Sequence, residues 1–234
     1  MTDEVDALDT LKRVAVFRDA DEEDLRLLAA NGVPRAVEEG GYFFFQGDPA
    51  DHFFILTSGM AKLCQITVDG QQVNLRTLFP HQVFGAVGAV DPSRVYPACA
   101  QALEDCSALA FPSAALRAVV QKTPEVSFGM MRLMTGYIQE MQERFSELAS
   151  EDVEQRVASA LLRLAGQFGR RTDEGLLVEL AFTRQDLAEM TGTTLYTVSR
   201  ILSAWEKSKI ITASRKRVTL LDPHALVRLA DGIP

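Results

Sequence analysis

Two short helices joined by a tight turn are predicted by the sequence TRQDLAEMTGTTLYTVSRILSAW, residues 183–205. Thr183 is placed to cap the first helix, and Asp186, three residues later, is placed to return a hydrogen bond, which together make a capping box. Gly192 permits the turn between the helices, and Thr194 is placed to cap the second helix. The stretch is therefore typical of a helix-turn-helix.

The second helix of this pair has one apolar side and one polar side. Four large residues recur at helical spacing and are expected to face the core: Val198, Ile201, Leu202 and Trp205. The other side presents polar groups in a row, which suits the major groove of DNA. The residues predicted to contact DNA are Thr183, Arg184, Gln185, Thr194, Tyr196, Thr197, Ser199, Arg200 and Lys216.

Basic residues gather around and behind this second helix. Residues 210–221 predict a two-stranded wing with a basic tip, and residues 196–217 hold six basic residues and one acidic residue. The whole chain carries a net charge of −8, divided into −9 for residues 1–150 and +1 for residues 151–234. A local cationic segment suits a phosphate backbone, and the alternative is a solvated basic face. Nucleic-acid binding is therefore expected only in the C-terminal third.

The segment before the helix-turn-helix predicts a long helix and then a shorter one. Pro124 opens the long helix, which runs to about Ala149, and its apolar residues alternate steps of four and three, as in a coiled-coil seam. At about 39 Å it is longer than one small domain can cover, so a homodimer is favoured over a helix that lies on its own domain. The predicted dimer-interface residues are Met130, Met134, Tyr137, Met141, Phe145 and Leu148. A helix from residue 153 to about 168, a loop over 169–175 and a strand over 176–180 follow.

Residues 33–111 consist of short runs of strand-forming residues separated by glycine turns. The clearest hairpin joins residues 60–68 to residues 71–79 through Asp69-Gly70, a dipeptide that favours a type I′ turn. Many short strands at this spacing indicate a sandwich or a barrel-like roll. A short helix is predicted over residues 21–30. The fold class is α+β, with a β-roll domain over 1–123, a dimerisation helix over 124–150 and a winged helix-turn-helix over 151–234.

The sequence contains no sign of an enzyme, a membrane span or a disulfide framework. Cys64, Cys99 and Cys106 are odd in number, lie outside any C-x-x-C spacing and are expected as buried hydrophobes in a reducing cytoplasm. The metalloprotease, serine hydrolase and P-loop motifs are absent. No apolar run reaches the roughly 18–20 residues of a membrane span. We therefore expect a cytoplasmic protein that is not an enzyme.

From Asp21 to its C-terminus the chain resembles the CRP/FNR superfamily of bacterial transcription regulators. The motifs that carry the resemblance are Gly47-Asp48 followed by FFIL at 53–56 and Ser58-Gly59, then Phe84-Gly85 at the start of a segment similar to the family's phosphate-binding cassette, and the helix-turn-helix. The resemblance implies a β-roll like the cyclic-nucleotide-binding domain, a double-stranded β-helix that binds an effector. It also implies a homodimer on a palindromic operator, with RNA polymerase as a partner if the protein is an activator.

The chain departs from this family where the two well-known effectors bind. Members that bind cAMP carry Gly-Glu in the cassette and Arg-Ser or Arg-Thr ten residues after the Glu, where this chain has Gly85-Ala86 and Tyr96-Pro97. Tyr-Pro supplies one hydroxyl and removes a backbone N–H, although a cyclic phosphate needs a cation or several donors. Arg94 is the nearby alternative cation. The iron–sulfur branch needs an N-terminal cysteine cluster, and residues 1–63 contain no cysteine. We expect neither cAMP nor an iron–sulfur cluster.

An apolar effector pocket remains as the prediction for this domain. Its predicted lining is Gly85, Ala86, Val87, Tyr96, Pro97, Ala98, Cys99, Met134, Tyr137 and Met141. Such a pocket suits an apolar small molecule or haem, with His81 or Cys99 as the first candidates for metal ligands. A thiol-based redox sensor is a further option. The rival from another class is a nucleotide-sensing module that signals to a protein partner, which would have no use for Ser199, Arg200 and a basic wing.

Overall fold

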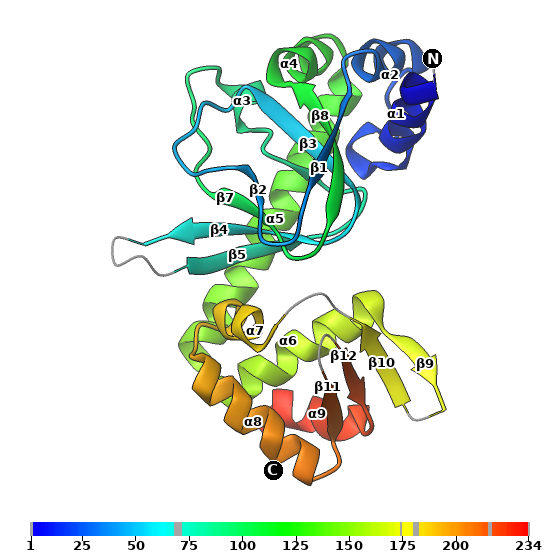
Figure 1. Ribbon diagram of the computed structural model, residues 1–234. Helices are drawn as coiled ribbons and strands as arrows, with labels where there is room; N and C mark the ends of the chain where they lie inside the picture. Colours follow the sequence, from blue (N-terminus) through cyan, green and yellow to red (C-terminus); the bar gives the residue numbers. More distant parts are fainter. Residues whose placement is uncertain (1, 68–71, 174, 180–182, 215–216, 234) are drawn as a thin grey trace. The chain divides into compact units, whose positions relative to one another are not determined.

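The computed structural model describes residues 2–67, 72–173, 175–179, 183–214 and 217–233 (Figure 1). The chain divides into two compact units, Met1–Glu140 and Met141–Pro234. The fold is α+β, as the sequence predicts. Within the described residues, no helix is both long enough and apolar enough to cross a membrane.

The first unit is a β-sandwich with helices on one side (Figure 1). Its elements are α1 (Thr2–Arg13), η1 (Ala15–Phe17), α2 (Glu22–Ala29), β1 (Val33–Val37), β2 (Tyr42–Phe44), β3 (His52–Ser58), β4 (Ala61–Ile66), β5 (Gln72–Leu78), β6 (Val83–Phe84), α3 (Val87–Val90), β7 (Cys99–Ala102), β8 (Cys106–Pro112), α4 (Ser113–Lys122) and the first part of α5 (Pro124–Ser150). The strands form two antiparallel sheets, in the orders β1-β8-β3-β6 and β2-β7-β4-β5.

Alternate residues of β3 show how the two faces of the first sheet are used. Phe54 and Leu56 face the second sheet and pack in one buried cluster with residues such as Phe44 and Leu78. Phe53 and Ile55 lie in the other cluster, together with residues of α1, η1, α2, α4 and the start of α5. This alternation is what a strand buried on both faces requires. The first unit therefore has one core between its sheets and a second core under its helices.

The predicted hairpin is present as β4 paired with β5, with Lys62 opposite Thr77. Its register shifts between Leu63 and Cys64, which indicates a β-bulge that the sequence pattern did not predict. The predicted turn, Asp69-Gly70, lies outside the described residues. The short helix predicted over residues 21–30 is α2. Helices α1 and α4 were not predicted.

The second unit combines helices with a small sheet. It consists of the end of α5, α6 (Val153–Phe168), β9 (Arg170–Thr172), β10 (Gly175–Glu179), α7 (Arg184–Thr191), α8 (Leu195–Lys207), β11 (Ile211–Ser214), β12 (Arg217–Leu220) and α9 (Pro223–Ala230). The sheet has the order β11-β12-β10-β9. The two predicted strands of the wing are present as β11 paired with β12, and β10 and β9 extend them to a four-stranded sheet. One expectation is corrected: the predicted loop over 169–175 contains β9, because Arg170 and Arg171 pair with β10.

Candidate nucleic-acid interface and sensor interior

The first helix of the predicted pair, α7, is held at its start by a capping box. The Asp186 backbone N donates to Thr183 Oγ1 at 3.2 Å, and the Thr183 backbone N donates to Asp186 Oδ2 at 2.8 Å. Gly192 ends the helix with a φ of +62°, which glycine adopts without strain. Thr194 then caps α8 by accepting from the Thr197 backbone N at 3.2 Å. The predicted helix-turn-helix and both of its caps are confirmed.

The second helix, α8, is anchored through its apolar side. The four residues predicted to face the core are all buried: Val198, Ile201, Leu202 and Trp205. Trp205 Nε1 also donates to Glu154 Oε1 on α6 at 2.8 Å. On the opposite side Tyr196 is 76% exposed and Arg200 is exposed. These two residues are one helical turn apart, so their side chains lie one above the other.

The predicted contact residues at the start of α7 have partners within the protein. Arg184 is exposed, and its guanidinium lies 4.0 Å from the Glu206 carboxylate. Gln185 is exposed and donates to Glu189 Oε1 at 3.1 Å. Both contacts are on the surface, where such pairs contribute little to stability, so either side chain can exchange its partner for a phosphate.

Hydroxyl groups and basic groups complete the surface around α8. The Thr194 and Thr197 hydroxyls lie 3.0 Å apart and hold the cap, and Ser199 is half-buried. Exposed basic side chains continue beyond the helix at Lys207, Lys209 and Arg217. Leu195, 46% exposed at the first position of α8, is an apolar member of this surface that the residue list above did not include. Lys216 and the predicted basic wing tip lie outside the described residues.

Helix α5 carries an apolar stripe that its own chain leaves uncovered. Six residues spaced alternately by three and four are each 52–75% exposed: Met131, Met134, Ile138, Met141, Phe145 and Leu148. Four of them were predicted for the dimer interface. The other two predicted residues are corrected, because Met130 packs against the helical core of the first unit and Tyr137 contacts that unit. The Tyr137 hydroxyl donates to the Val83 carbonyl at 3.2 Å, and the Arg76 guanidinium lies 3.7 Å from its ring centroid.

Aromatic rings fill the space between the two sheets at the position of the predicted effector pocket. Tyr96 is 3% exposed and stacks on Phe44 with 3.7 Å between ring centroids. Its hydroxyl donates to the His52 carbonyl at 2.6 Å and accepts from the His52 backbone N at 3.3 Å. Burial raises the pKa of Tyr96 to about 12, so the hydroxyl keeps its proton at neutral pH. A Cβ on Gly85 would lie 3.2 Å from the Tyr96 ring.

The remaining predicted pocket residues lie in different surroundings. Ala98 and Cys99 are buried, Val87 packs against the core between the sheets, and Ala86 packs against the helical core. Pro97 presents its carbonyl to Gln65 Nε2 at 3.1 Å. Met134 and Met141 are exposed on α5. Sequence spacing does not show these surroundings, because they depend on contacts between distant residues such as Gln65 and Pro97.

Arg94 was the candidate cation near the cassette, and His81 was a candidate metal ligand. Arg94 is exposed, and its Nε lies 3.1 Å from Asp91 Oδ2, so its charge is already balanced at the surface. His81 adopts a φ of +68°, and its buried Nδ1 has no hydrogen-bond partner among the residues that the structure describes. Among the described residues, no three His, Cys, Asp or Glu side chains are grouped as metal ligands.

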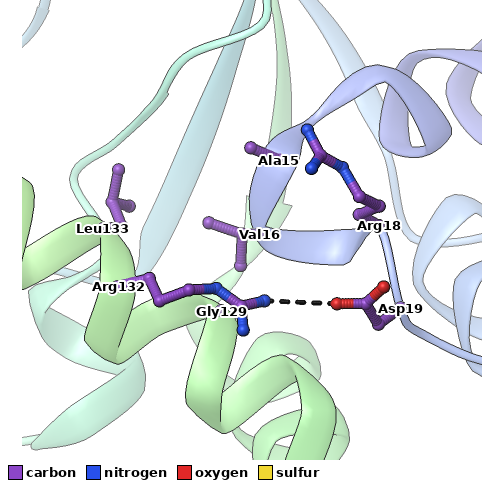
Figure 2. Close-up of a pocket in the computed structure, with 7 residues that line it drawn as sticks. All are labelled: Ala15, Val16, Arg18, Asp19, Gly129, Arg132 and Leu133. Atoms are coloured by element: carbon purple, nitrogen blue, oxygen red, sulfur yellow. Dashed lines mark hydrogen bonds and ion pairs between the residues drawn. The ribbon is translucent and has the colours of Figure 1, made fainter.

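A surface hollow of about 490 Å³ lies between η1 and α5, and none of the residues that line it was predicted for the effector pocket (Figure 2). It is lined by Ala15, Val16, Arg18, Asp19, Gly129, Arg132 and Leu133. Arg132 donates to Asp19 across it at 3.3 Å. Gly129 matters for its shape, because a Cβ there would lie 2.3 Å from the Val16 carbonyl oxygen. A glycine inside a helix was the one sequence signal for this close approach.

Comparisons with known proteins agree with this division into a sensor and a helix-turn-helix. The family described as "Cyclic nucleotide-binding domain" matches residues 34–123, and the family described as "Crp-like helix-turn-helix domain" matches residues 155–229. The chain is 30% identical over 198 residues to the transcriptional activator protein anr of Pseudomonas aeruginosa, covering 85% of this chain and 80% of that protein.

A second relative and a solved structure extend the comparison. The chain is 26% identical over 220 residues to the CRP-like cAMP-activated global transcriptional regulator of Mycobacterium tuberculosis, covering 94% of this chain and 98% of the relative. FixK2 from Bradyrhizobium japonicum matches with a TM-score of 0.75 at 20% identity, covering 85% of this chain and 96% of FixK2. This structural similarity concerns the fold alone.

Proposed function

This chain belongs to the CRP/FNR family of DNA-binding transcription regulators, and from that premise we propose that it acts as a homodimer on a palindromic operator. Its sensor is a cyclic-nucleotide-binding-like domain. Proteins of this family are not enzymes. RNA polymerase is the further partner if the protein activates transcription, and the cytoplasm is its place of action.

The observation that carries the proposal is the exposed side of α8. Tyr196 and Arg200 stand one turn apart on a helix whose other side is locked by Trp205 and its buried neighbours. Arginine bound through two hydrogen bonds to guanine O6 and N7 is the commonest specific contact and contributes about 1–3 kcal/mol. Tyr196 stands where the resembled family has a glutamate that accepts from cytosine. We therefore propose that Arg200 reads a guanine in each half-site and that Tyr196 alters the preference at the neighbouring base pair.

The exposed stripe of α5 supports a homodimer, and a homodimer with twofold symmetry favours a palindromic operator. An alternation of three and four residues is the spacing of a coiled-coil seam. Six large apolar side chains left in water would be costly, and a second α5 offers the same stripe in return. Two recognition helices related by a twofold axis read half-sites about 10–10.5 bp apart, centre to centre.

The sensor interior supports an effector other than cAMP. Tyr96 stands at the sequence position where cAMP-binding members of the family carry an arginine, and its hydroxyl is already bonded twice to the His52 backbone. Arg94, the alternative cation, is paired with Asp91 at the surface. A cyclic phosphate would thus meet an aromatic cluster in place of a cation and several donors.

Selection from random DNA duplexes tests the DNA-binding proposal. The full-length protein is incubated with a duplex library at about 0.15 M salt, and the bound fraction is sequenced after several rounds. We expect an inverted repeat with half-sites about 10–10.5 bp apart and one guanine fixed in each half. Recovery of no common sequence, or of a single unrepeated half, would contradict the proposal. A repetition at lower salt separates weak from non-specific binding.

A further inference from the structure

Two buried cysteines face each other across neighbouring strands of the second sheet. Cys64 on β4 and Cys99 on β7 are paired in register. Residues opposed in this way in an antiparallel ladder point to the same face and have Cα atoms about 4.5–5.5 Å apart. A disulfide bond needs about 4.4–6.8 Å between Cα atoms. The backbone therefore already holds this pair at disulfide spacing.

Gln46 and Asn74 lie on the two sides of the pair. The Gln46 backbone N donates to Cys99 Sγ at 3.3 Å, and Gln46 Oε1 accepts from the Ile66 backbone N at 3.3 Å, so Gln46, which follows β2, contacts both β7 and β4. On the other side, Asn74 of β5 is paired in register with Cys64. Asn74 is 4% exposed, and its Oδ1 and Nδ2 have no partner within the part of the chain that the structure describes. The pair therefore lies beside a buried amide, and Cys99 Sγ accepts one backbone hydrogen bond.

We propose that Cys64 and Cys99 form a reversible disulfide when the protein meets a hydroperoxide. The Cys99 thiolate attacks one oxygen of hydrogen peroxide, the O–O bond breaks, and the hydroxide that leaves takes up the thiol proton to become water. Cys64 then attacks the resulting sulfenic sulfur, the S–S bond forms, and the second hydroxide leaves with the Cys64 proton as water. The two thiols lose two electrons in total, and one peroxide becomes two waters.

The third cysteine provides an internal control. Cys106 on β8 is paired in register with Val37, and its Sγ donates to the Met60 carbonyl at 3.1 Å. Burial, as the main cause, raises the pKa of Cys106 to about 11, which keeps its thiol protonated. Cys106 is equally shielded from water yet has no cysteine opposite to it, so it should stay a thiol under the conditions that oxidise the pair.

Peptide mapping of the oxidised full-length chain tests the proposal. The protein is treated with about a tenfold excess of hydrogen peroxide, its remaining thiols are alkylated, and it is digested with trypsin. Cys64 lies in the tryptic peptide 63–76, and Cys99 and Cys106 share the peptide 95–117. A second cut after Glu104 separates these two cysteines. We expect peptide 63–76 linked to the Cys99 fragment, release of the link by dithiothreitol, and alkylated Cys106.

The variants sharpen the result. Cys106→Ser should form the same link, whereas Cys64→Ser and Cys99→Ser should form none. The oxidised wild-type protein should also melt about 5 °C or more above the reduced one, since the link closes a long loop. A link that involves Cys106, or oxidation that stops at sulfenic or sulfinic acid, would overturn the proposal, and the wild-type map decides this even if a variant fails to fold. The measurement concerns thiols alone, so its outcome does not depend on the proposed DNA binding.

Discussion

Two charges placed in the exposed stripe of α5 should dissociate the dimer. The double variant Ile138→Asp with Met141→Asp changes two neighbouring residues of the stripe, which are 56% and 67% exposed. Because both side chains already lie in solvent within the chain, their replacement leaves the core of each unit intact. Tyr137 is unsuitable for this test, since it packs on Arg76 and would unfold part of its own unit.

The structure gives the size of the effect. Full burial of such a side chain contributes about 1.5–3 kcal/mol, and somewhat more than half of each remains to be buried, so each contributes about 1–2 kcal/mol to association. Four side chains per dimer then amount to about 4–8 kcal/mol, which weakens the dimer at least about 10³-fold. Desolvation of four unpartnered carboxylates adds to this loss.

Light scattering coupled to size-exclusion chromatography measures the mass over a range of protein concentrations. Wild-type protein should be dimeric and the double variant monomeric, with equal helical content by circular dichroism. Gln139→Asp, which adds a charge at an exposed position next to Ile138 and outside the stripe, is the matched control and should remain dimeric. A double variant that keeps the wild-type dissociation constant would refute the assignment of this stripe as the interface.

Three further perturbations follow from particular contacts. Asp24 is 2% exposed and bonded to Lys122 Nζ at 2.6 Å and to the Thr123 hydroxyl, and these hydrogen bonds hold its pKa below the ordinary 3.8. The ionised Asp24 therefore stabilises the fold above about pH 4, and this stabilisation is lost as the pH falls through the lowered pKa. Asp24→Asn should destabilise the protein at pH 7 and weaken the dependence of the free energy of unfolding on pH in the acid range, measured by urea titration. An unchanged dependence on pH would refute this. Thr183→Val removes the cap of α7 and should lower the free energy of unfolding of the second unit by about 1 kcal/mol in urea titrations. Thr212→Val, at an exposed position of β11, is the surface control, and a loss below about 0.3 kcal/mol for Thr183→Val would be the contrary result. Calorimetry with cAMP at up to about 1 mM should give no binding heat, and a micromolar dissociation constant would contradict the filled sensor interior.

The helix-turn-helix could be predicted because its determinants are local. Thr183, Asp186, Gly192 and Thr194 act within a few residues of their positions, so their identity and spacing suffice to place both helices. The bounds predicted for the long helix and for α6 agree with the structure for the same reason: Pro124 and the Asp152 cap mark their starts in the sequence.

Features that depend on distant contacts escaped prediction. Tyr96 contacts Phe44 and His52, each about fifty residues away in the sequence, and no periodicity could indicate these contacts. The exposed stripe of α5 differs in part from the predicted dimer interface, because Tyr137 and Ile138 are adjacent and both largely apolar, so the sequence does not show which of them faces solvent. Contact with Arg76 and Val83 decides which of the two turns inward. Strand β9 forms only because β10 offers it an edge.

Binding of Arg200 variants to specific and non-specific DNA tests the central claim most directly. Fluorescence anisotropy gives the dissociation constants of wild-type protein, Arg200→Lys and Arg200→Ala for the selected operator and for a scrambled duplex at fixed salt. If Arg200 reads guanine, both variants should lose about 1–3 kcal/mol of affinity for the operator, and Arg200→Lys, which keeps the charge, should bind the scrambled duplex like wild type. If the ratio of the two affinities stays at its wild-type value in both variants, Arg200 only contacts phosphate and α8 does not read the sequence through it.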